Sequence, residues 1–208
     1  MRVTRVLSAL VLAMVLGAPG SAATFAGKVT VVGAFADPGL VIGVAPGPGF
    51  GTPDLRPGES HRFDAFRLWT DSAAVKTDDR LAQPISAQFT FVDLGATGVV
   101  TGKTVGEQVG RYVQQGSLTW DAPLVLRFGP GQSGQFTLAL SDALFNKGFR
   151  GLSGGAQNGA VVSATLTYDL APTMAAPIEV APIPLPAALP LLLGALGLMG
   201  AATRRRRG

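Results

Sequence analysis

The sequence predicts an all-β protein, with a single β-sandwich or jelly-roll-like domain over residues 24–170. Two observations predict this fold class. Apolar and polar residues alternate with a period of two over much of the stretch, as they do in strands that bury one face. Most of the 28 glycines also fall there and divide it into short segments.

The clearest expected strand runs from Val161 to Leu170, where apolar and polar side chains alternate. Such alternation places one face of a strand against a core and the other against solvent. The other expected strands contain these segments: Val29/Val31, Arg62–Thr70, Phe89/Phe91, Gly98–Val105, Leu118/Trp120, Leu124/Leu126/Phe128 and Phe136/Leu138/Leu140. About eight strands at this spacing favour two packed sheets.

Two segments of the predicted domain lack the alternation. The stretch from Asp37 to Gly58 contains five prolines and six glycines, and it predicts a long surface loop or an irregular sheet edge. The short stretch from Asp142 to Asn146 predicts a single helical turn after a strand.

Charge is distributed unevenly along the chain. Of the 17 lysines and arginines, 6 lie at Arg2, Arg5 and Arg204–Arg207, which leaves 17 − 6 = 11 against all 13 acidic residues between positions 24 and 187. The middle of the chain therefore carries a formal charge of −2, which argues against a nucleic-acid partner. Cysteine is absent, so the chain has no disulfide, no cysteine-bound zinc and no thiol nucleophile.

Residues 1–23 have the pattern of a secretory signal peptide. A basic start is followed by an apolar run from Val6 to Leu16 and then by the small residues Ser21 and Ala23. We expect signal peptidase to cleave between Ala23 and Thr24 after the export machinery has engaged the chain. The apolar run has about 11 residues, which is short of the roughly 20 that cross a bilayer.

The C-terminal region divides into three parts. Residues 171–182 are rich in alanine and proline and predict a spacer. Prolines then stand at alternate positions through Pro186, which excludes a helix and keeps that segment extended. The uncharged stretch 187–203 spans about 25 Å as a helix and predicts a transmembrane segment. The arginines 204–207 keep its far end cytoplasmic.

This tail resembles the VPLPA variant of the PEP-CTERM sorting domain of Gram-negative bacteria. The residues that carry the resemblance are Ile183, Pro184, Leu185, Pro186 and Ala187, followed by the apolar stretch and by Arg204, Arg205, Arg206 and Arg207. The resemblance covers residues 183–208, with isoleucine at position 183 where the family usually has valine. It implies an exosortase that recognises the motif and releases or transfers the protein near Pro186.

The resemblance also implies where the protein is found. The chain would be held briefly in the inner membrane by its C-terminal helix and would then reach the cell surface or the extracellular matrix. There, exopolysaccharide is a further candidate partner. The leading functional hypothesis is thus a non-enzymatic surface or matrix protein without a cofactor.

Two glycine motifs fit poorly with the chemistry they usually carry. Residues 129–134 match GxGxxG, but an alternating strand pattern follows where a dinucleotide site needs a helix, so we expect a hairpin turn. Residues 151–155 match GxSxG, but the only histidine, His61, lies upstream and no helical pattern follows. We expect a loop there, a surface position for His61, and no catalytic residue.

Two alternative functions remain open. The first is a carbohydrate- or calcium-binding module, for which Asp71, Asp78 and Asp79 could supply oxygens, although a solvated turn is the favoured interpretation of these aspartates. The aromatic residues available to bind a sugar would be Trp69, Tyr112, Trp120 and Tyr168. The second is a secreted hydrolase, which would require carboxylates converging around His61.

Overall fold

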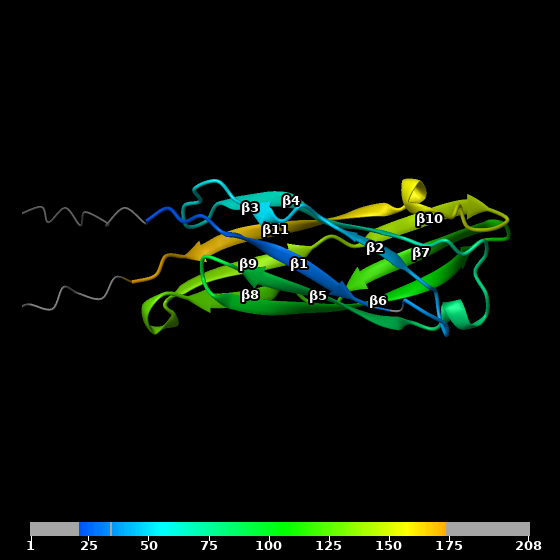
Figure 1. The fold of residues 1–208 in the computed structure, drawn as a ribbon, viewed down its shortest axis with the longest axis horizontal. Coiled ribbons are helices and arrows are strands. Elements are labelled where there is room, and N and C mark those ends of the chain that lie inside the picture. The colour runs from blue at the N-terminus through cyan, green and yellow to red at the C-terminus, as the bar shows by residue number, and fades with distance from the viewer. Residues whose placement is uncertain (1–20, 34, 174–208) are drawn as a thin grey trace, which may run out of the picture. The chain divides into compact units, whose positions relative to one another are not determined.

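Eleven strands form two antiparallel sheets in the computed structural model, which describes residues 21–33 and 35–173 (Figure 1). One sheet contains β1 (Ala26–Val32), β3 (Phe50–Gly51), β5 (Gln83–Phe91), β6 (Ala96–Val109), β7 (Val113–Trp120) and β10 (Ala143–Phe149). The other contains β2 (Gly43–Pro46), β4 (Ser60–Trp69), β8 (Leu124–Phe128), β9 (Gly134–Leu140) and β11 (Ala160–Leu170). The described residues also contain three short 3₁₀ turns: η1 (Asp78–Arg80), η2 (Pro130–Gln132) and η3 (Ala156–Asn158).

The strand order is β10-β7-β6-β5-β1-β3 in the six-stranded sheet and β2-β4-β11-β9-β8 in the five-stranded sheet. Neighbouring strands are antiparallel throughout both sheets. The predicted all-β class is confirmed, and the two sheets form a β-sandwich-like arrangement.

Aromatic side chains from both sheets fill the space between them. Phe25, which immediately precedes β1, and Phe91 of β5 both contact Phe136 of β9, with ring centroids 5.1 and 4.7 Å apart. Tyr168 of β11 lies 5.5 Å from Phe25. All four side chains are completely buried. Burial of each large apolar side chain contributes about 1.5–3 kcal/mol, and these contacts bind the two sheets together without a disulfide.

The strands predicted from alternation are present. The expected strand from Val161 to Leu170 corresponds to β11, whose residues Val162, Ala164, Leu166 and Tyr168 are all buried. The segments predicted at the other seven positions correspond to β1, β4, β5, β6, β7, β8 and β9.

The expectation of a helical turn from Asp142 to Asn146 is wrong, because Ala143–Phe149 forms β10 and pairs with β7. The alternation is broken there by a shift of register between Phe145 and Gly148. Asn146 lies within this bulge with φ of 50°, a left-handed conformation that asparagine tolerates better than most residues. The bulge thus removes the period-two signal from a true edge strand.

The segment from Asp37 to Gly58 contains two short edge strands. Strand β2 pairs only with β4, and β3 pairs only with β1, so this one segment supplies an edge to each sheet. Pro46 is accommodated at the end of β2 because an edge strand has a side that needs no hydrogen-bond donor. The prediction of an irregular edge is therefore confirmed.

The side chain of Asn146 joins three segments and is completely buried. Its Oδ1 accepts a hydrogen bond from the backbone N–H of Thr70 at 2.8 Å, just after β4. Its Nδ2 donates to the carbonyl oxygens of Ser153 and Gly155, at 2.5 and 3.0 Å. One amide therefore satisfies a donor and two acceptors that would otherwise be buried at the ends of other elements.

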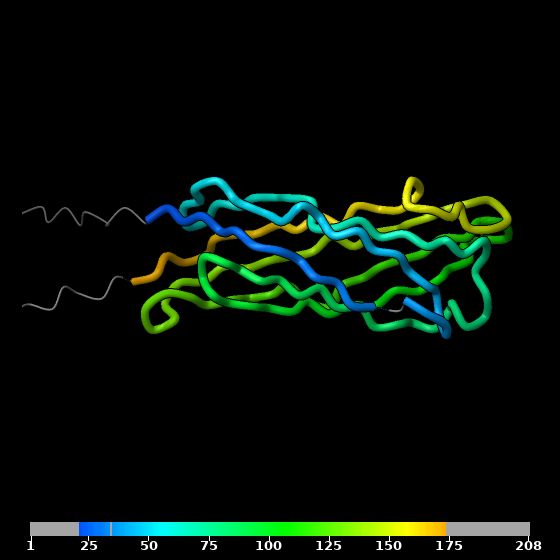
Figure 2. The backbone as a smooth tube through the Cα atoms, in the orientation of Figure 1, coloured from blue at the N-terminus to red at the C-terminus, as the bar shows by residue number. Residues whose placement is uncertain are grey.

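The two ends of the described domain lie at the same pole (Figure 2). Residues 21–25 enter β1 there, and β11 ends beside them, with the Tyr168 hydroxyl 3.5 Å from the carbonyl oxygen of Ser21. The turn between β6 and β7 and the loop after β10 lie at the opposite pole. We call these the terminal pole and the distal pole.

Replacing Asn146 by alanine should lower the free energy of unfolding by about 3 kcal/mol. It removes three hydrogen bonds, leaves buried backbone groups unpaired, and puts alanine in a left-handed conformation. Chemical denaturation of the full chain in a neutral detergent measures the change. The matched control is Asn158→Ala, which removes one exposed bond to Gly154 and should cost less than about 1 kcal/mol. Equal losses from the two variants would contradict the role given to Asn146.

Replacing Thr104 by valine should raise the stability by about 1 kcal/mol. Thr104 is completely buried in β6, and its Oγ1 has no hydrogen-bond partner among the described residues, so valine keeps the shape and removes an unsatisfied polar atom. Thr52→Val is the control, because the Thr52 Oγ1 accepts from the Phe25 N–H at 2.9 Å and its loss should destabilise. Thermal unfolding distinguishes the two directions, and a lower Tm for Thr104→Val would contradict the prediction.

Candidate functional site

Two exposed aromatic rings meet at the distal pole. Tyr112 lies in the turn between β6 and β7, and Phe149 is the last residue of β10. Their ring centroids are 5.5 Å apart, although the side chains are 42% and 70% exposed. Large aromatic surface is usually buried, so a pair left in solvent at one pole marks a candidate binding surface.

Two arginines accompany the rings. The Arg111 guanidinium lies 5.4 Å from the centroid of the Tyr112 ring, and the Arg150 guanidinium lies 5.5 Å from the same ring and 5.6 Å from that of Phe149. These distances are within the range of cation–π attraction. We call these four residues, Arg111, Tyr112, Phe149 and Arg150, the aromatic–arginine tip.

The backbone holds the tip in one arrangement. The Arg150 N–H donates to the Tyr112 carbonyl oxygen at 2.6 Å, which joins the loop after β10 to the β6–β7 turn. Arg150 has φ of 58°, a left-handed conformation that costs a non-glycine residue free energy. The next segment is fixed as well, because the Leu152 N–H donates to the Ala73 carbonyl oxygen at 2.8 Å. A ligand would therefore meet side chains whose backbone is already ordered.

Chemically, the tip combines flat apolar surface with cationic hydrogen-bond donors. Arginine presents a planar fork that matches a carboxylate, and an aromatic ring presents a face to another flat apolar surface. Among the described residues, neither Arg111 nor Arg150 has a carboxylate within 4.0 Å, so both can serve an external anion.

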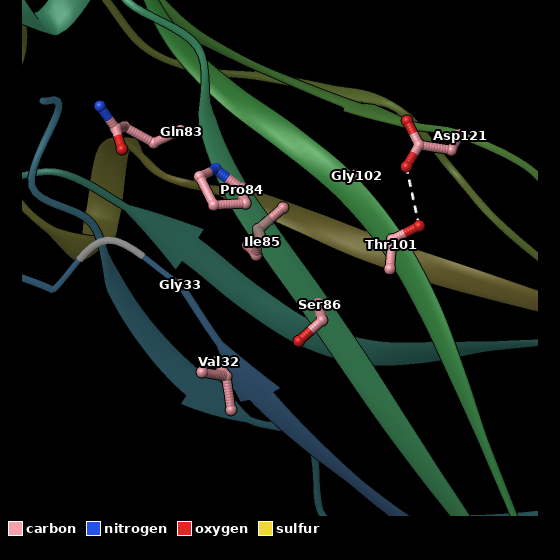
Figure 3. A pocket seen from close by; sticks show the side chains of 9 residues that line it. All are labelled: Val32, Gly33, Gln83, Pro84, Ile85, Ser86, Thr101, Gly102 and Asp121. Carbon is pink, nitrogen blue, oxygen red and sulfur yellow. Dashed lines mark hydrogen bonds between the residues drawn. The ribbon is translucent and has the colours of Figure 1, made fainter.

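A shallow hollow of about 470 Å³ lies where β1, β5 and β6 run side by side (Figure 3). Val32 and Ile85 supply apolar surface, and Asp121 stands at one side with its Oδ2 accepting a hydrogen bond from Thr101 Oγ1 at 2.7 Å. The lining residues are Val32, Gly33, Gln83, Pro84, Ile85, Ser86, Thr101, Gly102 and Asp121. This set holds one carboxylate and no histidine or lysine, so it offers neither a serine–histidine pair nor a pair of carboxylates.

The two glycine motifs lie in connections, as the sequence predicts. Residues 129–133 join β8 to β9 through η2 and Gly134 begins β9, so this GxGxxG match is a hairpin connection that a strand follows. Residues 151–155 form the loop between β10 and η3, and the Ser153 N–H donates to the Asn146 carbonyl oxygen at 3.0 Å. The serine of the GxSxG match is thus part of a structural loop.

His61 is far from that serine. It lies near the start of β4, half-buried and 6.4 Å from the Phe63 ring. The serine loop contacts Thr70, just past the other end of β4, through the Gly155 N–H. A strand advances about 3.3 Å per residue, so roughly 30 Å separate His61 from this loop. The geometry does not bring a serine–histidine pair together.

The three aspartates lie in different environments. Asp79 is only 2% exposed, and its Oδ2 accepts a hydrogen bond from the Lys76 N–H at 2.7 Å. The expectation of a solvated turn is therefore wrong for Asp79, because a backbone donor stabilises its buried carboxylate. Asp71 is exposed, with its Oδ2 3.4 Å from Trp69 Nε1, and Asp78 is half-buried in η1. Within residues 21–33 and 35–173, no three acidic, histidine or cysteine side chains gather as metal ligands.

Only one of the four aromatic residues considered from the sequence is strongly exposed. Tyr168 is buried, and this burial raises the pKa of its phenol above the ordinary value. Trp120 packs against Phe66 and donates to the Ser141 carbonyl oxygen at 3.2 Å, and Trp69 is half-buried. Of these four residues, only Tyr112 is exposed at the distal pole. Its exposed neighbour Phe149 is not among the residues considered from the sequence.

The predicted sorting residues fall largely outside the described part of the chain. Ile183–Ala187 and Arg204–Arg207 belong to the undescribed residues 174–208. At the predicted cleavage site, Ala23 pairs with Leu55 through two backbone hydrogen bonds of 2.8 and 2.9 Å, and Thr24 is exposed. No helix in the described ranges has the length and hydropathy needed to cross a membrane.

Comparison of the chain with protein-family models, with curated proteins and with solved structures gives no match. No relative therefore bears on the role of the aromatic–arginine tip.

Calcium at millimolar concentration should leave the Tm of the protein unchanged. The Asp79 carboxylate already has a backbone donor, and Asp71 lies beside Trp69, so neither is arranged to hold an ion. An ion present at 100 times its dissociation constant would add about 2.7 kcal/mol of stability and raise Tm by several degrees. Thermal unfolding with calcium, magnesium or a chelator checks this. A rise with calcium alone would instead support a calcium-binding module.

Proposed function

We propose that the chain is an exported, non-catalytic cell-surface or extracellular-matrix protein that an exosortase processes at its C-terminal tail. The observation that carries this proposal is the order of three features: an extended proline motif at residues 183–187, an uncharged stretch at 187–203, and the arginines at 204–207. Each feature has a separate physical role. The proline motif would present an extended peptide, the uncharged stretch would cross the membrane, and the arginines would fix the orientation of the chain.

The extent of the folded domain supports the proposal. Its eleven strands all lie between Ala26 and Leu170, inside the interval between the expected cleavage site and the expected sorting signal. Phe25 is already part of the core, so the fold begins just after the predicted signal peptide. After β11 the described chain is fixed once more, where the Thr173 N–H donates to Ser133 Oγ at 2.9 Å.

The arrangement of the two poles also supports a display role. The chain leaves the domain towards the expected sorting signal from the terminal pole (Figure 1). A domain attached at that pole would expose the distal pole, where the aromatic–arginine tip lies. Outward presentation of one pole is what a surface-attached protein needs in order to contact material around the cell.

A carbohydrate-binding role is the second candidate function, and the exposed Tyr112 and Phe149 favour it. The hydrolase alternative has less support. His61 stacks near Phe63, and the lining of the hollow beside β1, β5 and β6 contains a single carboxylate. Among the described residues, no group of three or more acidic, histidine or cysteine side chains gathers near either position.

Replacing Pro184 and Pro186 by alanine should leave membrane insertion intact but block processing. The apolar stretch and the arginines determine insertion, whereas the prolines keep the motif extended. The full-length variant should therefore accumulate in the membrane of a strain with a working exosortase. Pro177→Ala, in the spacer, is the matched control and should be processed normally.

Mass spectrometry of the surface fraction measures where the C-terminus of the mature protein lies. Wild-type protein should end near Pro186, and a chain deleted after Ala187 should be exported without a membrane stage. Recovery of wild-type surface protein with its C-terminus intact through Gly208 would reduce the tail to a permanent anchor and refute the sorting proposal.

A further inference from the structure

We propose that the aromatic–arginine tip binds a carboxylated polysaccharide, with the rings packing on sugar faces and the arginines pairing with uronate groups. This proposal deepens the proposed function. It depends on that function only in one respect, namely that export to the cell surface would bring the tip into contact with such a polymer. Its physical basis is the arrangement of Arg111, Tyr112, Phe149 and Arg150 at the distal pole.

The rings supply the first half of the recognition. A pyranose ring has an apolar face of C–H groups, and an exposed aromatic ring is the side chain that matches such a flat surface. Phe149 has no polar atom in its side chain, yet it is 70% exposed. It contributes little to the core in this position, and the free energy of leaving it in water would be recovered when a ligand covers it.

The arginines supply the second half. Both guanidiniums lie 5.4–5.6 Å from a ring centroid, so a ligand on the rings would place its substituents beside the guanidinium N–H groups. A carboxylate on the sugar would pair with such a fork in two parallel hydrogen bonds. A neutral glucan could use the rings but would leave the two charges unpaired. The combination therefore selects an acidic sugar.

The charge of the domain argues against a polyphosphate ligand. Residues 21–173 contain 11 basic and 12 acidic residues, so the formal charge is 11 − 12 = −1. Nucleic acids bind mainly through a broad basic surface that replaces condensed counterions. Two arginines on a slightly acidic domain give no such surface. A polysaccharide with one carboxylate per sugar needs only local pairing, and its repeats would increase the avidity of a small site.

The rigidity of the tip strengthens the case. The bond from Arg150 N–H to the Tyr112 carbonyl oxygen and the Asn146 side chain fix both segments before a ligand arrives. Ordering loops on binding costs free energy, and this cost is already met in the folded protein. The left-handed conformation of Arg150 serves the same purpose, because it directs the chain back across the β6–β7 turn.

The experiment measures binding of the full chain, immobilised in a neutral detergent, to polygalacturonate. Dextran serves as the neutral polymer, and dextran sulfate and single-stranded poly(dT) as other polyanions. Arg111→Gln combined with Arg150→Gln removes the charges and keeps side chains of similar length, and Phe149→Ala removes one ring. Arg127→Ala and Val125→Ala, at exposed positions on β8, are the matched controls. Equal Tm values establish that the variants are folded.

Saturable binding to polygalacturonate but not to dextran is expected. The arginine double variant and Phe149→Ala should each weaken it about tenfold or more, which is the effect of losing a charge-assisted pair or a buried aromatic contact. The β8 controls should bind like wild type. Absence of binding, equal binding to dextran, or tighter binding to dextran sulfate or poly(dT) would overturn the inference, and the last result would indicate a nucleic-acid ligand.

This assay is independent of the sorting experiment. A wild-type protein that binds polygalacturonate but keeps its C-terminus through Gly208 would overturn the sorting proposal and leave the tip assignment standing. A correctly processed protein that does not bind would do the reverse.

Discussion

The contact between aromatic rings across the two sheets is the interaction on which the rest of the structure depends. The chain has no cysteine, so burial must supply the stability that disulfides give many exported domains. The ring of Phe136 in β9 contacts Phe91 of the opposite sheet at 4.7 Å and Phe25, just before β1, at 5.1 Å. These rings set the distance between the two sheets, and the connections at both poles have to span that distance.

The distal pole depends on a second, polar constraint. Strand β10 lies at the edge of its sheet and contains a bulge, so few backbone bonds hold it there. The buried amide of Asn146 compensates by joining β10 to the end of β4 and to the loop before η3. A weak edge strand is thereby fixed firmly enough to hold Phe149 and Arg150 in place.

Strands with one fully buried face could be predicted from the sequence. In β11 the alternate apolar residues from Val162 to Tyr168 are all buried, although Ser163 is buried as well, where the register against β4 shifts. Where the backbone leaves the regular pleat, the signal is lost. At Asn146 a left-handed residue resets the alternation, and β2 and β3 have only 4 and 2 residues, too few to show a period of two.

The candidate site was harder to predict from the sequence, because the fold decides which of its residues lie together and which are exposed. Tyr112 and Phe149 are 37 positions apart in the numbered sequence, and only the pairing of β7 with β10 brings them together. Phe149 reads as an ordinary core residue until its exposure is known. The opposite error occurs at Asp79. A charged side chain is expected to be exposed to solvent, but the Asp79 carboxylate is buried and accepts a hydrogen bond from the Lys76 N–H.

The place of β11 in its sheet has a mechanical consequence. This strand runs from the distal to the terminal pole and is bonded to β4 on one side and β9 on the other. If the tip were held and the chain were pulled at its C-terminal side, the force would act along β11. Hydrogen bonds between antiparallel strands lie across that direction. They would therefore be loaded together in shear rather than opened one after another, and a protein attached in this way would resist tension at the moment its distal pole was engaged.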